Sequence, residues 1–180
     1  DLVQGDVILY LKYLTESFYS MAQDKQVILS FSTPLKELVM DYDEAKWQHL
    51  IYNLLSNAIK FTPSGGNVRL SVNQIIKNDH AFIEIQVQDS GVGIAPTHLA
   101  HIFDRFYQIE KKERTPISST YAGTGIGLAL TRELTELMGG SIAVQSKLEV
   151  GTTFCLQLPI QRQAEKVSTE LVMPPPEQEV

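Results

Sequence analysis

Apolar and polar positions alternate along this chain with two different periods, and the changes of period divide it into helices and strands. Residues 3–22 carry apolar side chains at mixed three- and four-residue steps, which predicts an amphipathic helix. A second helix is predicted from an N-cap at Asp43 to about Phe61, where a Pro- and Gly-containing turn follows. A third, over residues 125–138, opens on glycine and ends at a Gly-Gly pair.

Segments with a period of two, or with short apolar runs, predict strands. Residues 77–80 between two of these segments are polar and predict a hairpin turn. Neighbouring strands are therefore expected to be antiparallel, and the fold class is α+β, with helices on one face of a sheet. The predicted strands cover residues 27–31, 68–72, 83–87, 141–146 and 152–158.

The composition of the 180 residues predicts one globular domain and narrows the classes of function. Hydrophobic residues make up 43%, and 15 basic against 21 acidic residues give a net charge of −6, which argues against a general nucleic-acid binder. The one cysteine, Cys155, excludes an intrachain disulfide and makes a zinc site a poor interpretation. The chain opens at Asp1 without a methionine, a signal peptide or a membrane-spanning run, so we expect a fragment of a larger protein.

The helix predicted over 43–61 has two distinct faces. One is apolar, and the other carries His49, Asn53, Asn57 and Lys60 at steps of four, four and three residues. A solvated face is the ordinary interpretation of such a stripe. Asparagine is a poor helix former, however, and its amide oxygen binds hard cations, while the lysine can meet an anion. A metal beside an anion suggests a nucleoside triphosphate.

Two glycine-containing segments extend this suggestion. In "DSGVGIAP", residues 89–96, Asp89 ends an apolar strand, where it either caps a turn or accepts a hydrogen bond from an adenine amino group. In "GTGIGLAL", residues 123–130, three alternating glycines precede a helix and expose N–H groups to an anion. Leu128 replaces the third glycine of the dinucleotide fingerprint, and no Walker lysine follows, so another nucleotide fold is expected.

The order of five motifs resembles the catalytic ATP-binding domain of sensor histidine kinases over about residues 1–159. The motifs are "NLLSNAIKFT", "DSGVGIAP", "IFDRFYQ", "GTGIGLAL" and "GTTFCLQLP". The resemblance implies the Bergerat-type ATP-binding fold, a two-layer α/β sandwich in which a mixed, mainly antiparallel sheet packs on about three helices. It also implies that residues 160–180 form a linker or a disordered tail.

The same resemblance implies the site residues and the cofactors ATP and Mg²⁺. Asn57 would coordinate Mg²⁺ with help from Asn53, Lys60 would contact phosphate, and Asp89 would receive the adenine amino group. The remaining implied ATP-binding residues are Gly91, Gly93, Phe106, Gly123, Gly125, Gly127, Leu128 and Thr153.

The segment "IFDRFYQ" is expected to lie beside a lid of about residues 108–124. Phe103 and Phe106 would form an aromatic hinge or simply core contacts, and Arg105 would reach the terminal phosphate or a partner domain. Lys111, Lys112 and Arg114 of the lid either attract ATP or are solvated loop charges.

The resemblance finally implies the reaction that the domain catalyses and the domain that accepts the phosphoryl group. Related hydrolytic ATPases carry a glutamate where this chain has Asn53, so phosphoryl transfer is favoured over hydrolysis. None of His49, His80, His98 and His101 lies in the family's acceptor pattern, so the acceptor histidine is expected on a separate dimerisation domain, and this chain alone should be weakly active or inactive. A degenerate nucleotide-binding module and a gyrase-type ATPase remain alternatives.

The parent protein is expected to be a homodimer that acts on a response regulator or receiver domain. This domain is expected in the cytoplasm. For the parent protein, an anchor in the inner membrane is one of two open alternatives.

Overall fold

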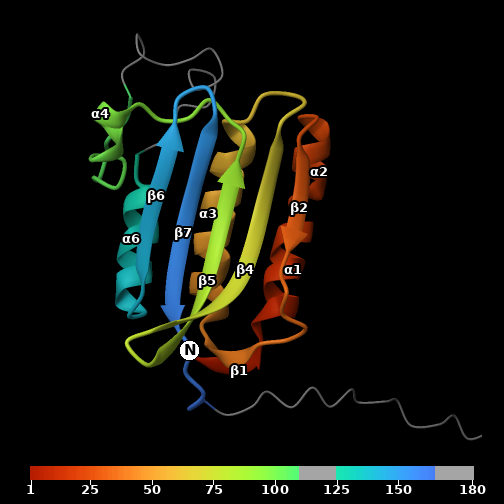
Figure 1. Ribbon diagram of the computed structural model, residues 1–180, viewed down its shortest axis with the longest axis vertical. Coiled ribbons are helices and arrows are strands. Elements are labelled where there is room, and N and C mark those ends of the chain that lie inside the picture. The colour runs from red at the N-terminus through yellow and green to blue at the C-terminus, as the bar shows by residue number, and fades with distance from the viewer. Residues whose placement is uncertain (110–124, 165–180) are drawn as a thin grey trace, which may run out of the picture.

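The computed structural model describes residues 1–109 and 125–164, and it consists of a helical layer packed on one face of a five-stranded sheet (Figure 1). The strand order is β2-β4-β5-β7-β6. β2 runs parallel to β4, whereas the other three pairs are antiparallel. The strands are β2 (Ile28–Ser32), β4 (Asn67–Lys77), β5 (His80–Asp89), β6 (Ser141–Lys147) and β7 (Gly151–Pro159).

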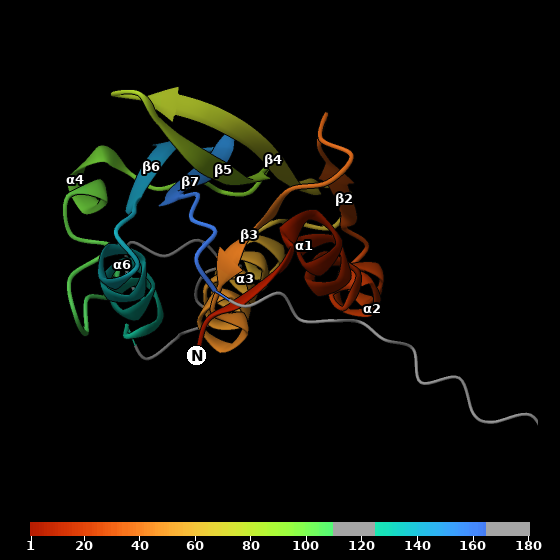
Figure 2. The same ribbon diagram turned by 90° about the horizontal axis from the view of Figure 1, so that it is seen from below.

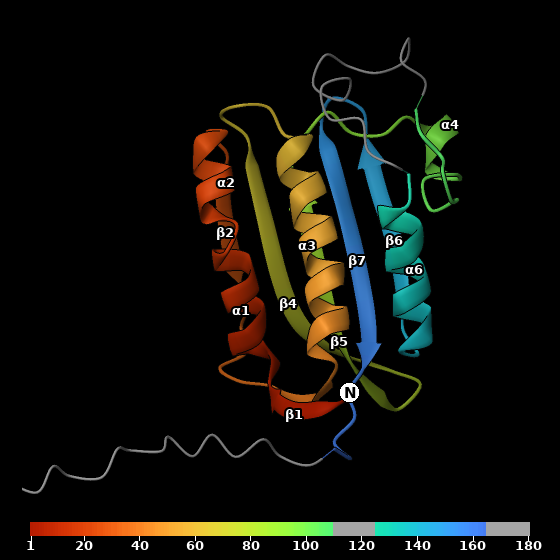
Figure 3. The same ribbon diagram turned by 180° about the vertical axis from the view of Figure 1, so that it is seen from behind.

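The principal helices all lie on the same side of the sheet, as the views from below and from behind show (Figures 2 and 3). The short helix α4 lies beside β6 at the sheet edge (Figure 1). This arrangement confirms the α+β, two-layer prediction with a mixed, mainly antiparallel sheet. The helices are α1 (Val7–Glu16), α2 (Tyr19–Asp24), α3 (Glu44–Lys60), α4 (Pro96–Leu99) and α6 (Gly127–Leu137).

The core lies between α3 and the inner face of the sheet. Alternate residues of β4, β5 and β7 point inward, so that Leu70, Ile85 and Leu156 are almost completely buried. Leu54 and Leu55 on the apolar face of α3 meet them. Full burial of each such side chain contributes about 1.5–3 kcal/mol. The apolar face of α3 therefore fixes the rotation of this helix and turns its polar stripe away from the sheet.

The prediction of a single helix over residues 3–22 is wrong. Residues Val3–Asp6 form β1, which pairs antiparallel with β3 (Val39–Tyr42). Asp6 then caps α1, because its Oδ1 accepts a hydrogen bond from the N–H of Ile8. The helical path breaks again at Ser17 and Phe18, where the Phe18 ring packs edge-to-face on Tyr52 of α3 at 4.9 Å. Contacts with β3 and α3 thus override a pattern that is locally helical.

Several local predictions are confirmed. Asp43 caps α3 by accepting the N–H of Lys46 at 3.0 Å, and α3 ends at Lys60 with Phe61 as its C-cap. The β4–β5 hairpin turns at Asn78 and Asp79, which both have positive φ as a type I′ turn requires. The strands and helix predicted after residue 125 are also present, whereas β3 and α4 were not predicted.

The chain after β7 returns to the strand that leads into α3. The N–H of Asp41 in β3 donates to the carbonyl of Gln161, and the Asp41 carboxylate accepts from the N–H groups of Gln163 and Ala164. Burial alone would raise the pKa of Asp41, but these bonds and one from Gln4 together lower it below its ordinary value. Residues 165–180 of the predicted tail lie outside the described residues. In the described ranges no helix is long and apolar enough to cross a bilayer.

Candidate functional site

The polar stripe of α3 lies on the helix face opposite its apolar core contacts. His49 is exposed, whereas Asn53, Asn57 and Lys60 are half-buried near the C-terminal half of the helix. The Asn57 side chain makes no hydrogen bond to any described residue, so its amide oxygen is available to a hard cation. Lys25 of the α2 C-cap donates to the carbonyls of Ile59 and Lys60, which holds the end of this helix in place.

Asn53 contacts α6 directly. Its Nδ2 donates to Oγ1 of Thr131 at 2.7 Å, and the same hydroxyl donates to the carbonyl of Gly127 at 2.8 Å. The Asn53 Oδ1 lies against Gly127, where an added Cβ would approach it to 2.4 Å. A side chain at position 127 would therefore displace the Asn53 amide from its place against α6.

Asp89 lies at the end of β5 and is 8% exposed. Its Oδ1 accepts the N–H of Gly91 at 2.9 Å and that of Thr152 at 3.2 Å. Burial raises the pKa of this carboxyl to about 6, although both hydrogen bonds act to lower it. Since these two donors use only Oδ1, Oδ2 remains for a donor such as an exocyclic amine.

The loop after Asp89 is wedged between the end of α3 and the β6–β7 turn. The N–H of Val92 donates to the carbonyl of Phe61, and the Val92 carbonyl accepts from Glu149. Gly93 has a φ of +72°, and an added Cβ there would lie 2.1 Å from the carbonyl oxygen of Lys147. The closest neighbours of this glycine are thus backbone atoms of Lys147 and Leu148.

The structure does not bring Thr153 into this site. Thr153 pairs with Gln88, and both lie on the outer face of the sheet, whereas Asp89 pairs with the buried Thr152. The Thr152 hydroxyl lies 2.7 Å from Oγ of Ser146, which accepts the N–H of Ile94 in the glycine loop. Of the two threonines in "GTTF", Thr152 therefore lies beside Asp89, whereas Thr153, which the sequence interpretation selected, lies on the other face of β7.

The two phenylalanines of the segment "IFDRFYQ" lie in different environments. Phe103 packs edge-to-face on Phe154 at 6.2 Å, in agreement with a core contact, whereas Phe106 is 71% exposed. The Phe106 N–H donates to the carbonyl of Gly125, which joins this segment to the start of α6. Arg105 donates through Nε and Nη2 to Oε1 of Glu133 at 2.8 and 2.6 Å, so in this structure its guanidinium is held on α6.

The second glycine segment leads directly into α6. Gly127 begins the helix, Leu128 is half-buried against the core, and Ile126 stands at the N-cap without a side-chain oxygen to cap the first N–H groups. These donors are the expected phosphate contacts. Gly123 and residues 110–124 of the predicted lid, with Lys111, Lys112 and Arg114, lie outside the described residues.

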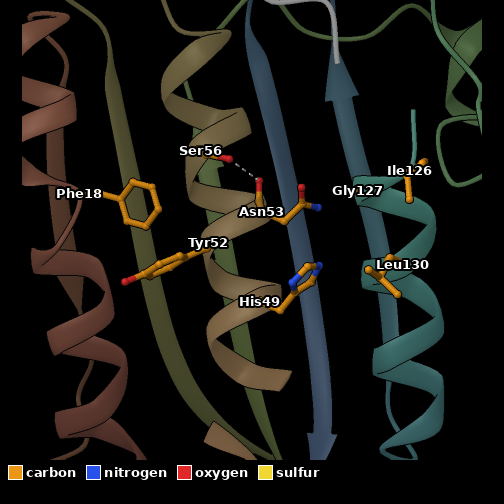
Figure 4. Close-up of a pocket in the computed structure, with 8 residues that line it drawn as sticks. All are labelled: Phe18, His49, Tyr52, Asn53, Ser56, Ile126, Gly127 and Leu130. Carbon is orange, nitrogen blue, oxygen red and sulfur yellow. Dashed lines mark hydrogen bonds between the residues drawn. The ribbon is translucent and has the colours of Figure 1, made fainter. Parts of the chain in front are cut away.

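An open groove of about 470 Å³ separates α3 from α6 on the helical side of the molecule (Figure 4). Asn53 and Gly127 line it, whereas Asp89 is not among its lining residues. The other lining residues are Phe18, His49, Tyr52, Ser56, Ile126 and Leu130.

Comparison with known proteins identifies the class to which this fold and site belong. Residues 42–162 match the family of histidine kinase-, DNA gyrase B- and HSP90-like ATPases, and the chain belongs to that family. Within it, the relatives are histidine kinases, and the chain is a histidine kinase ATP-binding catalytic domain.

Three of the sequence relatives are the following histidine kinases. Histidine kinase P4 of Formosa agariphila is 33% identical over 159 residues, which cover 88% of this chain and 11% of that protein. Sensor histidine kinase RppB of Synechocystis sp. is 36% identical over 82% of this chain and 31% of its own length. The circadian input-output histidine kinase CikA of Synechococcus elongatus is 38% identical over 79% of this chain and 18% of its own length. The chain thus spans less than a third of each.

Solved structures confirm the fold. The catalytic domain of histidine kinase ThkA superposes with a TM-score of 0.74 at 19% identity, covering 90% of this chain and 99% of that domain. Full-length ShkA in complex with AMPPNP gives a TM-score of 0.74 at 27% identity, covering 92% of this chain and 32% of that protein.

Proposed function

We propose that this domain binds Mg·ATP and transfers the γ-phosphoryl group to a histidine on a separate dimerisation domain, within two-component signalling. The observation that carries the proposal is the state of Asp89: a buried carboxylate with one oxygen occupied by two backbone N–H groups and the other available. Such a group discriminates in favour of a base that carries an amino group, since a buried acceptor without a donor is costly.

The other predicted residues are arranged to receive the triphosphate along α3 and the start of α6. Asn57 would hold Mg²⁺ through its amide oxygen, Lys60 would contact a phosphate oxygen, and the N–H groups at Gly125 and Gly127 would bind phosphate through the α6 N-terminus. The bound Mg²⁺ would neutralise charge on the transferring phosphoryl group. The ShkA structure is a complex with AMPPNP, and this supports nucleotide binding by a protein that contains this fold.

The site favours transfer over hydrolysis. A hydrolytic enzyme needs a base aimed at water, and the residue one turn before Asn57 is Asn53, whose amide is bonded to Thr131. Arg105 is bonded to Glu133, so it would have to leave that partner to reach a phosphate or an acceptor domain. We further propose a cytoplasmic location, a homodimeric parent and a response regulator or receiver domain as the downstream partner.

The test is phosphorylation of an added dimerisation domain from a histidine kinase relative with radiolabelled ATP. Wild-type protein should label the acceptor histidine, Asn57→Ala should not, and steady-state phosphate release should stay low for both. Binding of Mg·ATP without any labelling would instead indicate a degenerate module, and rapid phosphate release would indicate a gyrase-type ATPase.

A further inference from the structure

A buried hydroxyl on α6 controls which end of the Asn53 amide faces the site. Thr131 is 0% exposed, so its hydroxyl has no access to water and must find its partners within the protein. The hydroxyl has one proton, and it donates that proton to the Gly127 carbonyl at 2.8 Å, four residues earlier in the helix. While this bond is made, the oxygen of the hydroxyl accepts from Asn53.

This constraint fixes the orientation of the Asn53 amide. Its Nδ2 donates to Oγ1 of Thr131 at 2.7 Å. A reversed amide would place two oxygens at that distance unless the hydroxyl gave up its bond to Gly127, so only the observed orientation keeps both bonds. Oδ1 is consequently directed to the other side, against Gly127 at the start of α6 and at the edge of the groove.

We propose that Thr131 is a positioning residue that presents Asn53 Oδ1 as a fixed acceptor toward the magnesium ion or its bound water. This inference rests on the proposed function. An oxygen is the ligand that Mg²⁺ requires, and an amide free to rotate would offer its NH₂ group half of the time. Thr131 itself does not line the groove, whereas Asn53 and Gly127, to which its hydroxyl is bonded, do.

The neighbouring turn of α6 supplies a matched control. Thr135 is also 0% exposed, and its hydroxyl donates to the Thr131 carbonyl at 2.7 Å, again four residues earlier. Thr135→Val therefore removes a hydroxyl that is equally buried and makes the same type of bond to the backbone. It leaves the hydrogen-bond partner of Asn53 in place. Any general effect of an α6 hydroxyl on folding should be equal in the two variants.

The experiment measures ATP affinity over a series of Mg²⁺ concentrations for wild type, Thr131→Val, Thr131→Ser and Thr135→Val. Thr131→Val should weaken Mg·ATP at least fivefold and raise the Mg²⁺ concentration for half-maximal binding, whereas its affinity for ATP with EDTA should change less than twofold. Thr131→Ser keeps the hydroxyl and should stay within twofold of wild type, as should Thr135→Val. Equal Mg²⁺ dependence in Thr131→Val and Thr135→Val would overturn the proposal.

A second measurement applies even if Thr131→Val fails to fold. In wild-type protein labelled with ¹⁵N, the Asn53 side-chain amide protons should exchange more slowly with water than those of exposed asparagines such as Asn78. Fast exchange would contradict the proposed bond. Absence of Mg·ATP binding by folded wild type would be a different result, since it would overturn the proposed function while slow exchange still showed a fixed amide.

Discussion

The backbone N–H of Thr152 donates to Oδ1 of Asp89 at 3.2 Å, across the β5–β7 pair. Together with the Gly91 N–H at 2.9 Å, this bond occupies one carboxylate oxygen from the protein side and leaves Oδ2 for a ligand. In the proposed function, recognition of the base would therefore depend on a single oxygen whose position is fixed by two backbone groups on different elements.

Replacement of Asp89 should remove this recognition. Asp89→Asn keeps an oxygen for the two backbone donors and places NH₂ where Oδ2 was, so that a donor would face the adenine amino group. A hydrogen bond to a charged group contributes about 1.5–3 kcal/mol, and the affinity for ATP should fall at least tenfold. Glu84→Gln is the matched control, because Glu84 is half-buried on the same strand and bonded to Gln86 and Gln157. Isothermal titration should show near wild-type affinity for that control.

The raised pKa of Asp89, about 6, predicts opposite effects of pH on binding and stability. Below pH 6 the carboxyl takes up a proton and loses its full acceptor strength, so the affinity for ATP should fall between pH 7 and 5. The native state binds this proton more readily than the unfolded chain, so the unliganded domain should lose stability as pH rises from about 4 to 6. Asp89→Asn should show neither effect. Urea unfolding and titration calorimetry at pH 5 and 7 check this, and an identical pH dependence in Asp89→Asn would contradict it.

Gly93 should be intolerant of a side chain for steric reasons. It has a positive φ, and an added Cβ would lie 2.1 Å from the Lys147 carbonyl oxygen. Gly65 has a φ of +88° with no atom within 4 Å of an added Cβ, so it isolates the cost of backbone conformation. Gly65→Ala should destabilise the domain by about 1 kcal/mol. Gly93→Ala should cost a further ~1–3 kcal/mol through overpacking. Equal changes in the free energy of unfolding would exclude the steric explanation.

The cap of α3 should contribute to stability in a pH-dependent way. A hydrogen bond from the Lys46 side chain holds the pKa of Asp43 well below its ordinary value, although burial acts in the opposite direction. Bonds from the Lys46 N–H and the N-terminal amine lower this pKa further. Asp43→Ala should cost about 1 kcal/mol at pH 7. Because the folded pKa is depressed, the difference from wild type should shrink as pH falls below about 4. Asp43→Asn, which retains a capping oxygen, should be the milder variant in urea unfolding. A larger loss in Asp43→Asn than in Asp43→Ala would contradict the capping role.

The sequence predicted the features that depend on local chemistry, and these include most of the elements that form the site. The Asp43 cap, the α3 stripe and the end of β5 at Asp89 all follow from neighbours within a few residues. The pairing of β1 with β3 joins residues more than 30 positions apart and has no local signal, so the first helix was predicted too long.

The details that escaped prediction within the site have the same origin. Thr152 and Thr153 differ only in the face of β7 on which they lie, and only pairing with Asp89 decides which one enters the site. The bond between Asn53 and Thr131 joins residues 78 positions apart. Thr131 is a buried polar residue of α6, and its partner follows only from the packing of α6 on α3.

Calorimetric titration of Mg·ATP into this domain tests the central claim most directly. We predict one saturable binding site whose affinity falls at least tenfold in Asp89→Asn and also falls when Mg²⁺ is omitted or when Asn57 is replaced by alanine. Absence of binding heat at several temperatures, from protein whose circular dichroism shows a cooperatively folded domain, would contradict the claim.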